Sequence, residues 1–523
     1  MSRFLKFSTF AGIGGYTGYV LHQNDWNPRH IGLVRFGVAA YTVSQIAIDY
    51  KFSVSKLRDD SMETLEKWSQ CHQRSADRLL KLCCTNGGVF IKVGQHIAAL
   101  DYLVPKEYVN TLKILHSQAP RSKFSDIKKV IEKELGQQID EIFDEFDEKA
   151  IASASLAQVY RAKLRNSNET VAVKVQHPKV FQHSLVDIAT MEFLFNVIDR
   201  LFPDFSFMWL VNETKRNIPL ELDFVNEAKN SEKIAILLKD LPWLKIPHIY
   251  WKHTTKRVLM MEFVEGTSIT DKEFFISNRM NCQEIANRFE NMYGRMIYTY
   301  GTVHCDPHPG NVLVKKTGSK DFYLYLLDHG LYTQLTDEFR QNYSAFWLAI
   351  FRGDLKQIQE RAILMGIDEK DAPLLSCMVT AKPWSAISRG LENRPKDQTV
   401  ISKEKNELRK NASLYMHNIS QILGKVDRQL LLIMKTNDLI RNISHVLGCD
   451  ERRSLLNMNR YCIQTTSEQR LAQSRNMFQR IIIRLQTRYL YFKLSLYSFY
   501  LWMDSWFTYR SSSIIKSTLS AIE

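Results

Sequence analysis

A short loop and the apolar run that follows it carry the residues of this chain best suited to chemistry. Asp306 and Asn311 stand five positions apart in a segment with two prolines and a glycine, which disfavour helix and stiffen the loop. Asp328 follows an apolar run at residues 322–327 and precedes a His-Gly pair. Considered alone, each of these side chains could simply stabilise a turn by hydrogen bonding to its own backbone. Together they offer a proton-accepting carboxylate and oxygen ligands for magnesium, as phosphoryl transfer requires.

A lysine on a predicted strand and a glutamate on a predicted helix complete such a set. Residues 158–164 and 170–176 read as the two strands of a hairpin, and Lys174 lies on the face opposite three valines. Glu227 shares a predicted helix face with Asp223. A strand lysine is usually exposed and a charged helix face is usually solvated, so both residues also have an ordinary explanation. The order of these elements matches the protein-kinase set, which predicts that Lys174 binds nucleotide phosphates and pairs with Glu227.

The segment that should cover the nucleotide departs from the kinase pattern. No Gly-x-Gly-x-x-Gly precedes the strand lysine, and the alanines and serines in its place predict a stiffer turn. Glu262 and Val264 stand where a kinase hinge presents backbone groups to adenine, although strand packing alone explains that segment as well. No Ala-Pro-Glu follows Asp328, so an ordinary platform for peptide substrates is not expected. The predicted ATP-binding residues are Ile151, Ala152, Ser153, Ala154, Ser155, Val159, Lys174, Glu262 and Val264.

In these motifs the chain resembles the UbiB/aarF-domain atypical kinases, most closely a mitochondrial branch of that family. The segments that carry the resemblance are Lys92-Val-Gly-Gln95, similar to the KxGQ signature, Ala152-Ser-Ala-Ser155, similar to the alanine-rich loop, Glu221-Leu-Asp223, similar to the ExD motif, His304-Cys-Asp306-Pro-His-Pro-Gly-Asn311, similar to the catalytic loop, and Asp328-His-Gly330, similar to the metal motif. Ser153 and Cys305 depart from the usual residues at their positions.

The resemblance implies roles that composition and spacing do not. It implies that Lys92, Gly94 and Gln95 fold over the active site, held near Glu221 and Asp223, and exclude peptide substrates. It implies ATP and Mg²⁺ as cofactors, with Asn311 and Asp328 as the metal ligands. It also implies association with the mitochondrial inner membrane and a link to lipid or quinone metabolism. Without the family, Lys92 is more simply a solvated helix lysine.

The elements that must position these residues divide the 523-residue chain into four regions. We expect a basic leader at 1–55, a helical extension carrying KxGQ at 56–145, a kinase-like core at 146–365 and a C-terminal helical region at 366–523. A chain of this length exceeds what one hydrophobic core organises. The prediction is an α+β, bilobal protein-kinase-like fold with N- and C-terminal helical extensions.

Composition limits the class of protein and its partners. With 45% hydrophobic and 24% charged residues, the chain has the profile of a folded globular protein. The net charge of +14 is spread along the chain without a dense basic run, so no nucleic-acid partner is expected. The eight cysteines show no metal-like spacing and are expected to be reduced thiols.

Both ends of the chain carry segments that could meet a membrane. The first 24 residues contain no acid, which suits a mitochondrial targeting segment or an ordinary frayed terminus. The apolar stretch at 31–48 contains Arg35 and suits either a membrane-anchoring helix or a buried one. Residues 481–509 mix basic and aromatic side chains, which suits a membrane interface or a helix covering a core. With the resemblance, these segments predict a mitochondrial protein associated with the inner membrane.

The expected function is Mg-ATP-dependent kinase or ATPase activity, with Asp306, Lys174 and Glu227 as catalytic residues. The acceptor would be small or lipid-like, such as a quinone precursor, and the activity would support inner-membrane or cristae organisation and lipid homeostasis. The alternative is a non-enzymatic, nucleotide-gated scaffold at that membrane. A soluble antibiotic-phosphotransferase-like enzyme would share the Asp-x4-Asn loop but would leave residues 92–95 unexplained.

Overall fold

The computed structural model describes most of the chain. The described residues are 22, 27–54, 61–99, 104–116, 120–165, 167, 169–202, 208–318, 321–391, 422 and 426–519, with only the backbone for Glu451 and 504–519. The targeting segment expected at 1–24 lies outside them except for position 22. The chain forms two compact units, an N-terminal unit (Met1–Lys233, Pro247–Val264 and Tyr415–Gly424) and a C-terminal unit (Ile234–Ile246, Glu265–Leu414 and Lys425–Glu523), each described by itself.

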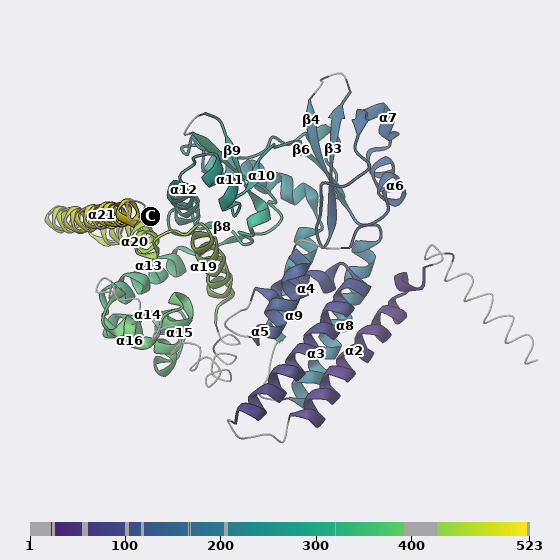
Figure 1. Ribbon diagram of the computed structural model, residues 1–523, viewed down its shortest axis with the longest axis horizontal. Helices are drawn as coiled ribbons and strands as arrows, with labels where there is room; N and C mark the ends of the chain where they lie inside the picture. The colour runs from purple at the N-terminus through teal and green to yellow at the C-terminus, as the bar shows by residue number, and fades with distance from the viewer. Residues whose placement is uncertain are drawn as a thin grey trace, which may run out of the picture. The chain divides into compact units, whose positions relative to one another are not determined.

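An antiparallel sheet carries Lys174 in the N-terminal unit (Figure 1). Its strands follow the order β1-β3-β4-β6, with β2 paired to β3. The strands are β1 (Phe143–Phe146), β2 (Ala152–Ser153), β3 (Ala157–Leu164), β4 (Thr170–Gln176) and β6 (Val258–Glu262). The predicted hairpin is thus confirmed as β3 and β4. Val171, Val173 and Val175 are buried in one core with residues of helices α6 (Phe124–Leu135) and α7 (Ile139–Ile142), which leaves Lys174 on the other face.

Helices make up the rest of the N-terminal unit. They are α2 (Gly32–Ser53), α3 (Met62–Asn86), α4 (Val89–Ala98), α5 (Lys106–Leu112), α8 (Val180–Leu201), α9 (Met208–Glu221) and α10 (Phe224–Leu237), with short 3-10 turns η1 (Pro28–His30), η2 (Lys113–His116) and η3 (Trp251–His253). The last turn of α10, from Ile234, belongs to the C-terminal unit. The break between α3 and α4 falls at Gly87 and Gly88, whose positive φ angles of 68° and 52° suit glycine. The sequence predicts this break.

The apolar stretch at 31–48 lies in helix α2, with Ile31 directly before the helix. It packs against α3 and α8, and Arg35 within it is buried. The Arg35 Nε donates to Asp187 Oδ1 at 2.7 Å, an ion pair inside the protein. These contacts hold one side of α2 in the N-terminal unit, while Leu33 and Phe52 on the same helix are exposed. Membrane anchoring by this stretch stays a prediction. Across the described ranges, no helix combines the length and apolar content needed to cross a bilayer.

The C-terminal unit contains two small sheets. A four-stranded sheet has the order β5-β10-β9-β7, and β8 pairs with β11 in a second one. The strands are β5 (Leu244–Lys245), β7 (Thr267–Ser268), β8 (Thr302–His304), β9 (Val312–Lys316), β10 (Phe322–Leu326) and β11 (Tyr332–Gln334). Strand β8 leads into the predicted catalytic loop, and β10 ends two residues before Asp328.

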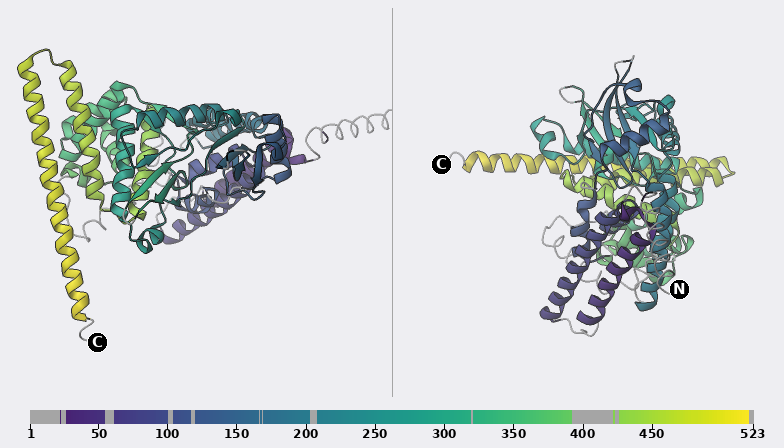
Figure 2. Two further views of the ribbon diagram at one scale, coloured as in Figure 1. Left: turned by 90° about the horizontal axis from the view of Figure 1, so that it is seen from above. Right: turned by 90° about the vertical axis from the view of Figure 1, so that its right-hand side faces the viewer.

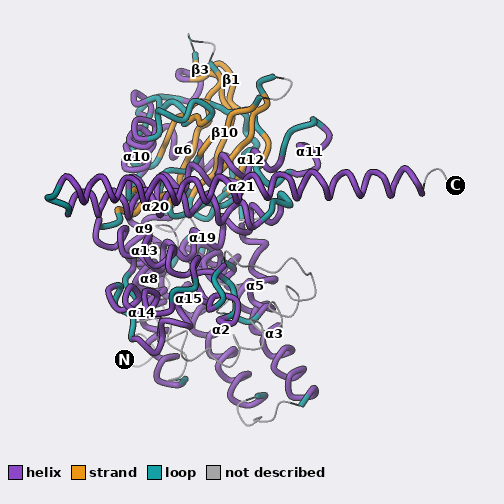
Figure 3. Tube along the Cα trace, turned by 90° about the vertical axis from the view of Figure 1, so that its left-hand side faces the viewer, coloured by secondary structure: helices purple, strands orange, loops and turns teal. Residues whose placement is uncertain are grey.

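The remainder of this unit is helical, as expected after Asp337. Its helices are α11 (Lys272–Ser277), α12 (Cys282–Gly294), α13 (Asp337–Arg352), α14 (Leu355–Leu364), α15 (Ala372–Thr380), α16 (Trp384–Ser388), α19 (Arg428–Val446), α20 (Glu451–Gln473) and α21 (Met477–Leu519), with 3-10 turns η5 (Pro309–Asn311) and η6 (Glu369–Asp371). Helices α20 and α21 lie side by side, and α21 runs on well past α20 (Figure 2, left; Figure 3).

One predicted helix differs in detail from the structure. The amphipathic pattern at 285–300 predicts a single α-helix ended by Gly301. The chain is instead α-helical to Gly294 and then forms a π-helical segment, Arg295–Tyr300. Gly301 ends it with a φ of 66°, as the sequence suggests.

Candidate active site

The predicted phosphate-binding lysine is buried in an ion pair. Lys174 Nζ lies 2.7 Å and 2.9 Å from the two carboxylate oxygens of Glu227. Lys174 is 9% exposed and Glu227 2% exposed. An exposed strand lysine and a solvated helix face, the ordinary explanations for these residues, are therefore both wrong. Across the sheet, Lys174 is flanked by Val159 and Leu259.

The start of α10 fixes the position of Glu227. Asp223 Oδ1 accepts hydrogen bonds from the amides of Val225 (3.1 Å) and Asn226 (3.4 Å), so it caps the helix. Phe224 then packs in a small core with Leu259 of the sheet. The prediction that Asp223 shares a helix face with Glu227 is wrong, because Asp223 precedes the helix and its side chain turns back to the backbone.

The alanine-rich segment forms a short strand and a tethered turn. Ala152 and Ser153 pair with β3, and the Ser153 hydroxyl donates to the Pro120 carbonyl at 3.4 Å. His177 Nε2 lies 3.0 Å from the carbonyl of Ala154. These bonds hold the turn next to the strand hairpin that carries Lys174. Nucleotide binding by Ile151, Ala152, Ser153, Ala154, Ser155 and Val159 stays a prediction.

The predicted hinge lies at the end of β6. The Glu262 amide donates to the His248 carbonyl at 2.8 Å, and its Cα is paired with Val171 of β4. The chain passes from the N-terminal into the C-terminal unit directly after Val264. Contact of Glu262 and Val264 with adenine remains a prediction.

Lys92, in the KxGQ segment, is buried rather than solvated. Its Nζ lies 2.6 Å from Glu221 Oε2, and the residue is only 9% exposed. The simple explanation of Lys92 as a solvated helix lysine is therefore wrong. Glu221 is the last residue of α9, so the pair joins α4 to α9 within the N-terminal unit.

Gly94 and Gln95 hold the helix that carries Lys92. A Cβ added to Gly94 would lie 2.5 Å from Leu115 Cδ1 and 3.0 Å from Cys83 Sγ, so only glycine allows this approach. Gln95 Nε2 donates to the Leu115 carbonyl at 3.0 Å. Both residues thus fix α4 against η2. A gating role for Lys92, Gly94, Gln95, Glu221 and Asp223 is a separate prediction that these contacts leave untested.

In the C-terminal unit, one histidine connects the predicted catalytic and metal motifs. The Asp306 amide donates to His304 Nδ1 at 3.3 Å, and His304 Nε2 lies 2.7 Å from the Asp328 carbonyl oxygen. Since an amide N–H can only donate, Nδ1 accepts, and the proton sits on Nε2 and is donated to Asp328. Burial lowers the pKa of His304, which agrees with a neutral imidazole. The Tyr293 hydroxyl, 3.1 Å from Nδ1, completes this arrangement.

Asn311 and Asp328 have conformations that suit cation ligands. Asn311 Nδ2 donates to the Asp306 carbonyl at 3.0 Å, which turns its Oδ1 away from that bond. Asp328 has a φ of 54°, in the left-handed region that non-glycine residues seldom adopt. Such strain concentrates at functional sites.

The donor set fits magnesium. An amide oxygen and carboxylates are the hard ligands this ion prefers, and Mg²⁺ usually takes one or two carboxylates with waters and substrate phosphates for the rest. Within the described ranges, no three His, Cys, Asp or Glu side chains could hold a metal ion by themselves. A site built from Asn311 and Asp328 would therefore rely on the nucleotide to complete it.

Two further histidines of these motifs have structural partners. His308 Nδ1 accepts from the Gly310 amide at 3.1 Å, a bond that braces the proline-rich loop. His329 Nδ1 lies 2.8 Å from the Tyr332 hydroxyl, and its Nε2 lies 3.1 Å from the Leu326 carbonyl. His329 thus ties the metal motif to β10 and β11.

The sequence did not reveal Lys435. Its Nζ lies 3.5 Å from Asp306 Oδ1, on helix α19 far along the chain. Leu432, one turn earlier on α19, packs with the buried Cys305 and Leu331. The small thiol at position 305 leaves room for this helix beside the catalytic loop. In the sequence, Lys435 is marked only by its place directly after the apolar run at 430–434.

Comparison with known proteins identifies the family of the chain. A model of the ABC1 atypical kinase-like domain matches residues 114–362. "AarF domain-containing protein kinase 1" of Gallus gallus is 45% identical over 96% of this chain and 96% of its own length. "AarF domain-containing kinase 1" of Drosophila melanogaster is 44% identical over 94% and 95%. The "ABC1 family protein MCP2 homolog" of Schizosaccharomyces pombe is 34% identical over 81% and 77%.

A solved structure is also similar. The complex of Rv3197 with erythromycin from Mycobacterium tuberculosis is 19% identical, covers 73% of this chain and 94% of its own, and has a TM-score of 0.43. The near full-length match to the AarF domain-containing relatives confirms the family resemblance seen in the motifs, and the α+β architecture described above confirms the predicted class. The chain belongs to the ABC1 (UbiB/aarF) family of atypical kinases.

Proposed function

We propose that this protein binds Mg-ATP and transfers its terminal phosphoryl group to a small or lipid-like acceptor. The observation that carries the proposal is the buried pair of Lys174 and Glu227. Burying a lysine is costly unless it is paired, and a glutamate that holds the ammonium in place fixes the position of a positive charge suited to phosphate oxygens. In phosphoryl transfer, a protein acts mainly by neutralising charge and positioning the reactants.

Each predicted catalytic residue has a distinct task in this proposal. Asp306 accepts the proton of the acceptor hydroxyl, and His304 holds the loop that presents it. Asn311 and Asp328 hold Mg²⁺, which when bound neutralises charge on the phosphates. Lys174 binds the phosphates from the sheet of the N-terminal unit. Lys435 supplies a second cation next to Asp306.

A small acceptor is favoured over a peptide by two features. The sequence lacks the Ala-Pro-Glu of the ordinary peptide platform. The KxGQ segment is rigidly fixed by the pair of Lys92 with Glu221 and by the contacts of Gly94 and Gln95. A quinone precursor or a lipid with a free hydroxyl is the kind of acceptor we expect.

A non-enzymatic scaffold gated by nucleotide is the second candidate, and one observation favours it. Lys435 is bound to the carboxylate that would otherwise accept the proton. If this pair persists with nucleotide bound, it lowers the basicity of Asp306 and disfavours proton transfer, and binding would then alter mainly the conformation. The two candidates differ in whether ATP is consumed.

We also propose that the protein works at the mitochondrial inner membrane, through α21. Large apolar side chains recur on its outer face at spacings of three and four, and we call this set the outer stripe: Phe478, Ile482, Leu485, Tyr489, Phe492 and Leu496. Arg484 and Arg488 stand beside the stripe, and no Asp or Glu occurs from 469 to 503. An apolar face flanked by arginines suits an anionic bilayer surface.

The central test is ATP turnover by the wild type and Asp306→Asn, with and without quinone precursors and hydroxyl-bearing lipids. Loss of a general base lowers turnover by about 10²- to 10⁴-fold, while nucleotide affinity should be kept. Asp321→Asn, at an exposed aspartate between β9 and β10, is the matched control and should behave as wild type. Equal turnover in Asp306→Asn would remove Asp306 from the chemistry. Binding without any turnover in the wild type would favour the scaffold.

A further inference from the structure

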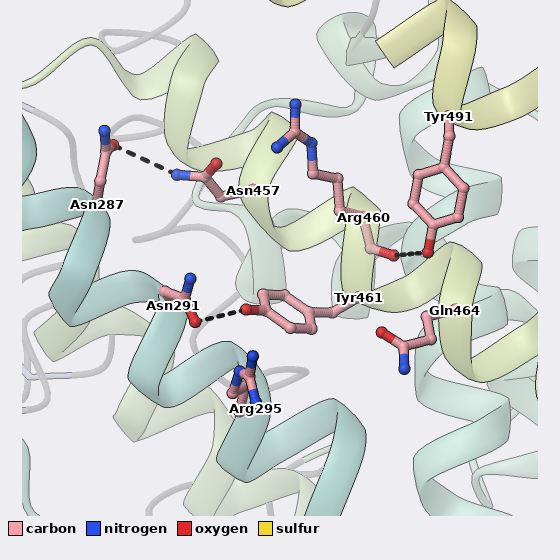
Figure 4. A pocket seen from close by; sticks show the side chains of 8 residues that line it. All are labelled: Asn287, Asn291, Arg295, Asn457, Arg460, Tyr461, Gln464 and Tyr491. Carbon is pink, nitrogen blue, oxygen red and sulfur yellow. Dashed lines mark hydrogen bonds between the residues drawn. The ribbon is translucent and has the colours of Figure 1, made fainter. Parts of the chain in front are cut away.

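A polar groove in the C-terminal unit lies outside the candidate active site. It has a volume of about 350 Å³ and lies between α12 and α20, with Tyr491 of α21 at one side (Figure 4). From α12 and the π-helical segment come Asn287, Asn291 and Arg295, spaced by four and therefore on one helix face. From α20 comes a facing row that includes Arg460. In the part of the chain that the structure describes, no carboxylate lines the groove.

Hydrogen-bond donors in the groove outnumber acceptors. The Tyr461 hydroxyl donates to Asn291 Oδ1 at 2.7 Å, so the amide N–H groups of Asn291 are left for another partner. Asn287 is oriented in the same way, because its Oδ1 accepts from Asn457 Nδ2 at 3.4 Å. Figure 4 shows both amide nitrogens turned away from these bonds.

The two arginines add charge to these donors. Among the described residues, the Arg460 guanidinium has neither an ion pair nor a hydrogen bond with another side chain. Arg295 pairs with Asp240 through Nη1, yet its Nε is buried without an acceptor. A buried N–H with no partner is costly, and a ligand oxygen would remove that cost. Three carboxylates, of Asp240, Glu290 and Glu468, bond to lining residues without lining the groove themselves. The guanidinium of Arg460 therefore remains the uncompensated charge of the groove.

The backbone around the groove has an unusual construction. A Cβ on Gly294 would lie 2.5 Å from the Tyr461 ring, so α12 can approach α20 this closely only with glycine at that position. The π-helical segment begins with the next residue, Arg295. Thr465 of α20 donates to the Tyr298 carbonyl at 2.8 Å and so satisfies one of the acceptors that the irregular turn releases. π-helical turns are rare in proteins, and those that occur are often found at functional sites.

The geometry points to a phosphate-binding site in this groove, formed by Arg295, Arg460 and the amides of Asn287 and Asn291. A planar guanidinium matches phosphate oxygens in a bidentate manner, and amide N–H groups donate to the remaining ones. The ligand is the phosphate group of a small phosphorylated molecule or of a phospholipid headgroup, since both present the same oxygens. The site shares no residue with the candidate active site and does not depend on the proposed ATP chemistry.

The test measures phosphate binding by the full-length protein with titration calorimetry. The probes are inorganic phosphate, glycerol 3-phosphate and a short-chain phosphatidic acid kept below its micelle concentration. All titrations use a background with both Lys174→Met and Glu227→Gln, which removes the cation of the predicted nucleotide site without leaving a buried glutamate charged beside it. Arg460→Ala removes the unpaired cation, and Asn291→Asp keeps the acceptor for Tyr461 while adding a negative charge. Arg470→Ala, on the same helix but outside the groove, is the control.

Saturable binding of at least one probe, weakened by about tenfold or more in Arg460→Ala and Asn291→Asp but not in Arg470→Ala, is the expected result. Binding of inorganic phosphate and glycerol 3-phosphate would identify a soluble ligand, and binding of phosphatidic acid alone a lipid headgroup. Absence of saturable binding for all three probes would overturn the proposal. Equal binding in Arg460→Ala and in the control would overturn it as well. Circular dichroism of each variant checks that the fold is kept.

Discussion

Lys435 Nζ lies 3.5 Å from Asp306 Oδ1, so a helix of the C-terminal region supplies the cation next to the predicted catalytic carboxylate. Leu432 anchors that helix on Cys305, the residue directly before Asp306. Because Leu432 is packed one turn away, Lys435 is held near the Asp306 carboxylate. We expect it to stay there when nucleotide phosphates bring negative charge into the site. This contact connects helix α19 to the predicted catalytic loop.

We therefore expect Lys435→Met to lower ATP turnover by about 10²-fold, because it removes one oriented cation from the reacting centre. Nucleotide affinity and the folded state should change little, since Lys435 is partly exposed and methionine keeps most of its volume. Steady-state turnover and a thermal unfolding scan check both points. Lys356→Met, on the solvent face of α14, is the control. If turnover rises instead, the ion pair inhibits Asp306 and the gated-scaffold proposal gains support.

Glu227→Gln tests the buried pair in the N-terminal unit. The change keeps the shape but removes the charge that orients Lys174, so we expect nucleotide affinity to fall by about tenfold. A fluorescent ATP analogue titrated in the presence of magnesium gives the affinity. Glu232→Gln alters a glutamate on the same helix that accepts from Trp251 Nε1 and should leave binding unchanged. Superimposable titrations of Glu227→Gln and wild type would contradict the role of the pair.

The ion pair of Lys92 with Glu221 determines the effect on stability that we expect from removing Lys92. Lys92→Ala would remove the ammonium that lies 2.6 Å from the largely covered Glu221 carboxylate, so we expect a loss of about 3 kcal/mol in unfolding free energy. Adding Glu221→Gln to Lys92→Ala should recover much of that loss. A gating role requires that nucleotide affinity still differs from wild type in the double variant. Denaturant unfolding and nucleotide titration of the three proteins separate the two effects, and an unchanged affinity would leave the segment with a structural role alone.

The sequence predicts the local parts of this site well and the distant contacts poorly. Strand periodicity places Lys174 correctly, and the prolines and glycine around Asp306 predict its loop, because both signals depend on neighbouring residues. Lys435 could not be found in this way, since its partner lies on another element and no pattern in α19 marks it. The burial of Lys92 likewise depends on where α9 ends, which periodicity does not give. The π-helical segment begins beside the close approach of Gly294 to Tyr461, a contact between distant residues that only the folded unit brings about.

Protonation of His304 should loosen the catalytic loop. Its pKa is lowered by burial, so the neutral form stabilises the folded loop fully above the ordinary histidine pKa of about 6.5, and this contribution is lost as pH falls through the lowered value. A protonated Nδ1 can no longer accept from the Asp306 amide. Hydrogen exchange of peptides covering 303–311, corrected for the intrinsic pH dependence, should accelerate in acid. In His304→Gln, whose amide oxygen does not titrate, the acceleration should be absent; an identical pH profile would show that another group controls the loop.

The outer stripe of α21 provides the test of membrane contact. Phe492 is 64% exposed, and the described part of the stripe lies opposite the face packed on α20. Leu485→Glu with Phe492→Glu puts two carboxylates into this apolar face, and we expect flotation with vesicles containing anionic phospholipid to be lost. Ser495→Glu adds a negative charge to the same helix outside the stripe and should keep most of the binding.

Arg484→Gln with Arg488→Gln should weaken binding to anionic vesicles but leave any residual binding to neutral ones, because these arginines contribute charge and not apolar area. A stripe that instead joins two copies of the chain would leave flotation unaffected by Leu485→Glu with Phe492→Glu while converting a dimer to a monomer in sedimentation velocity.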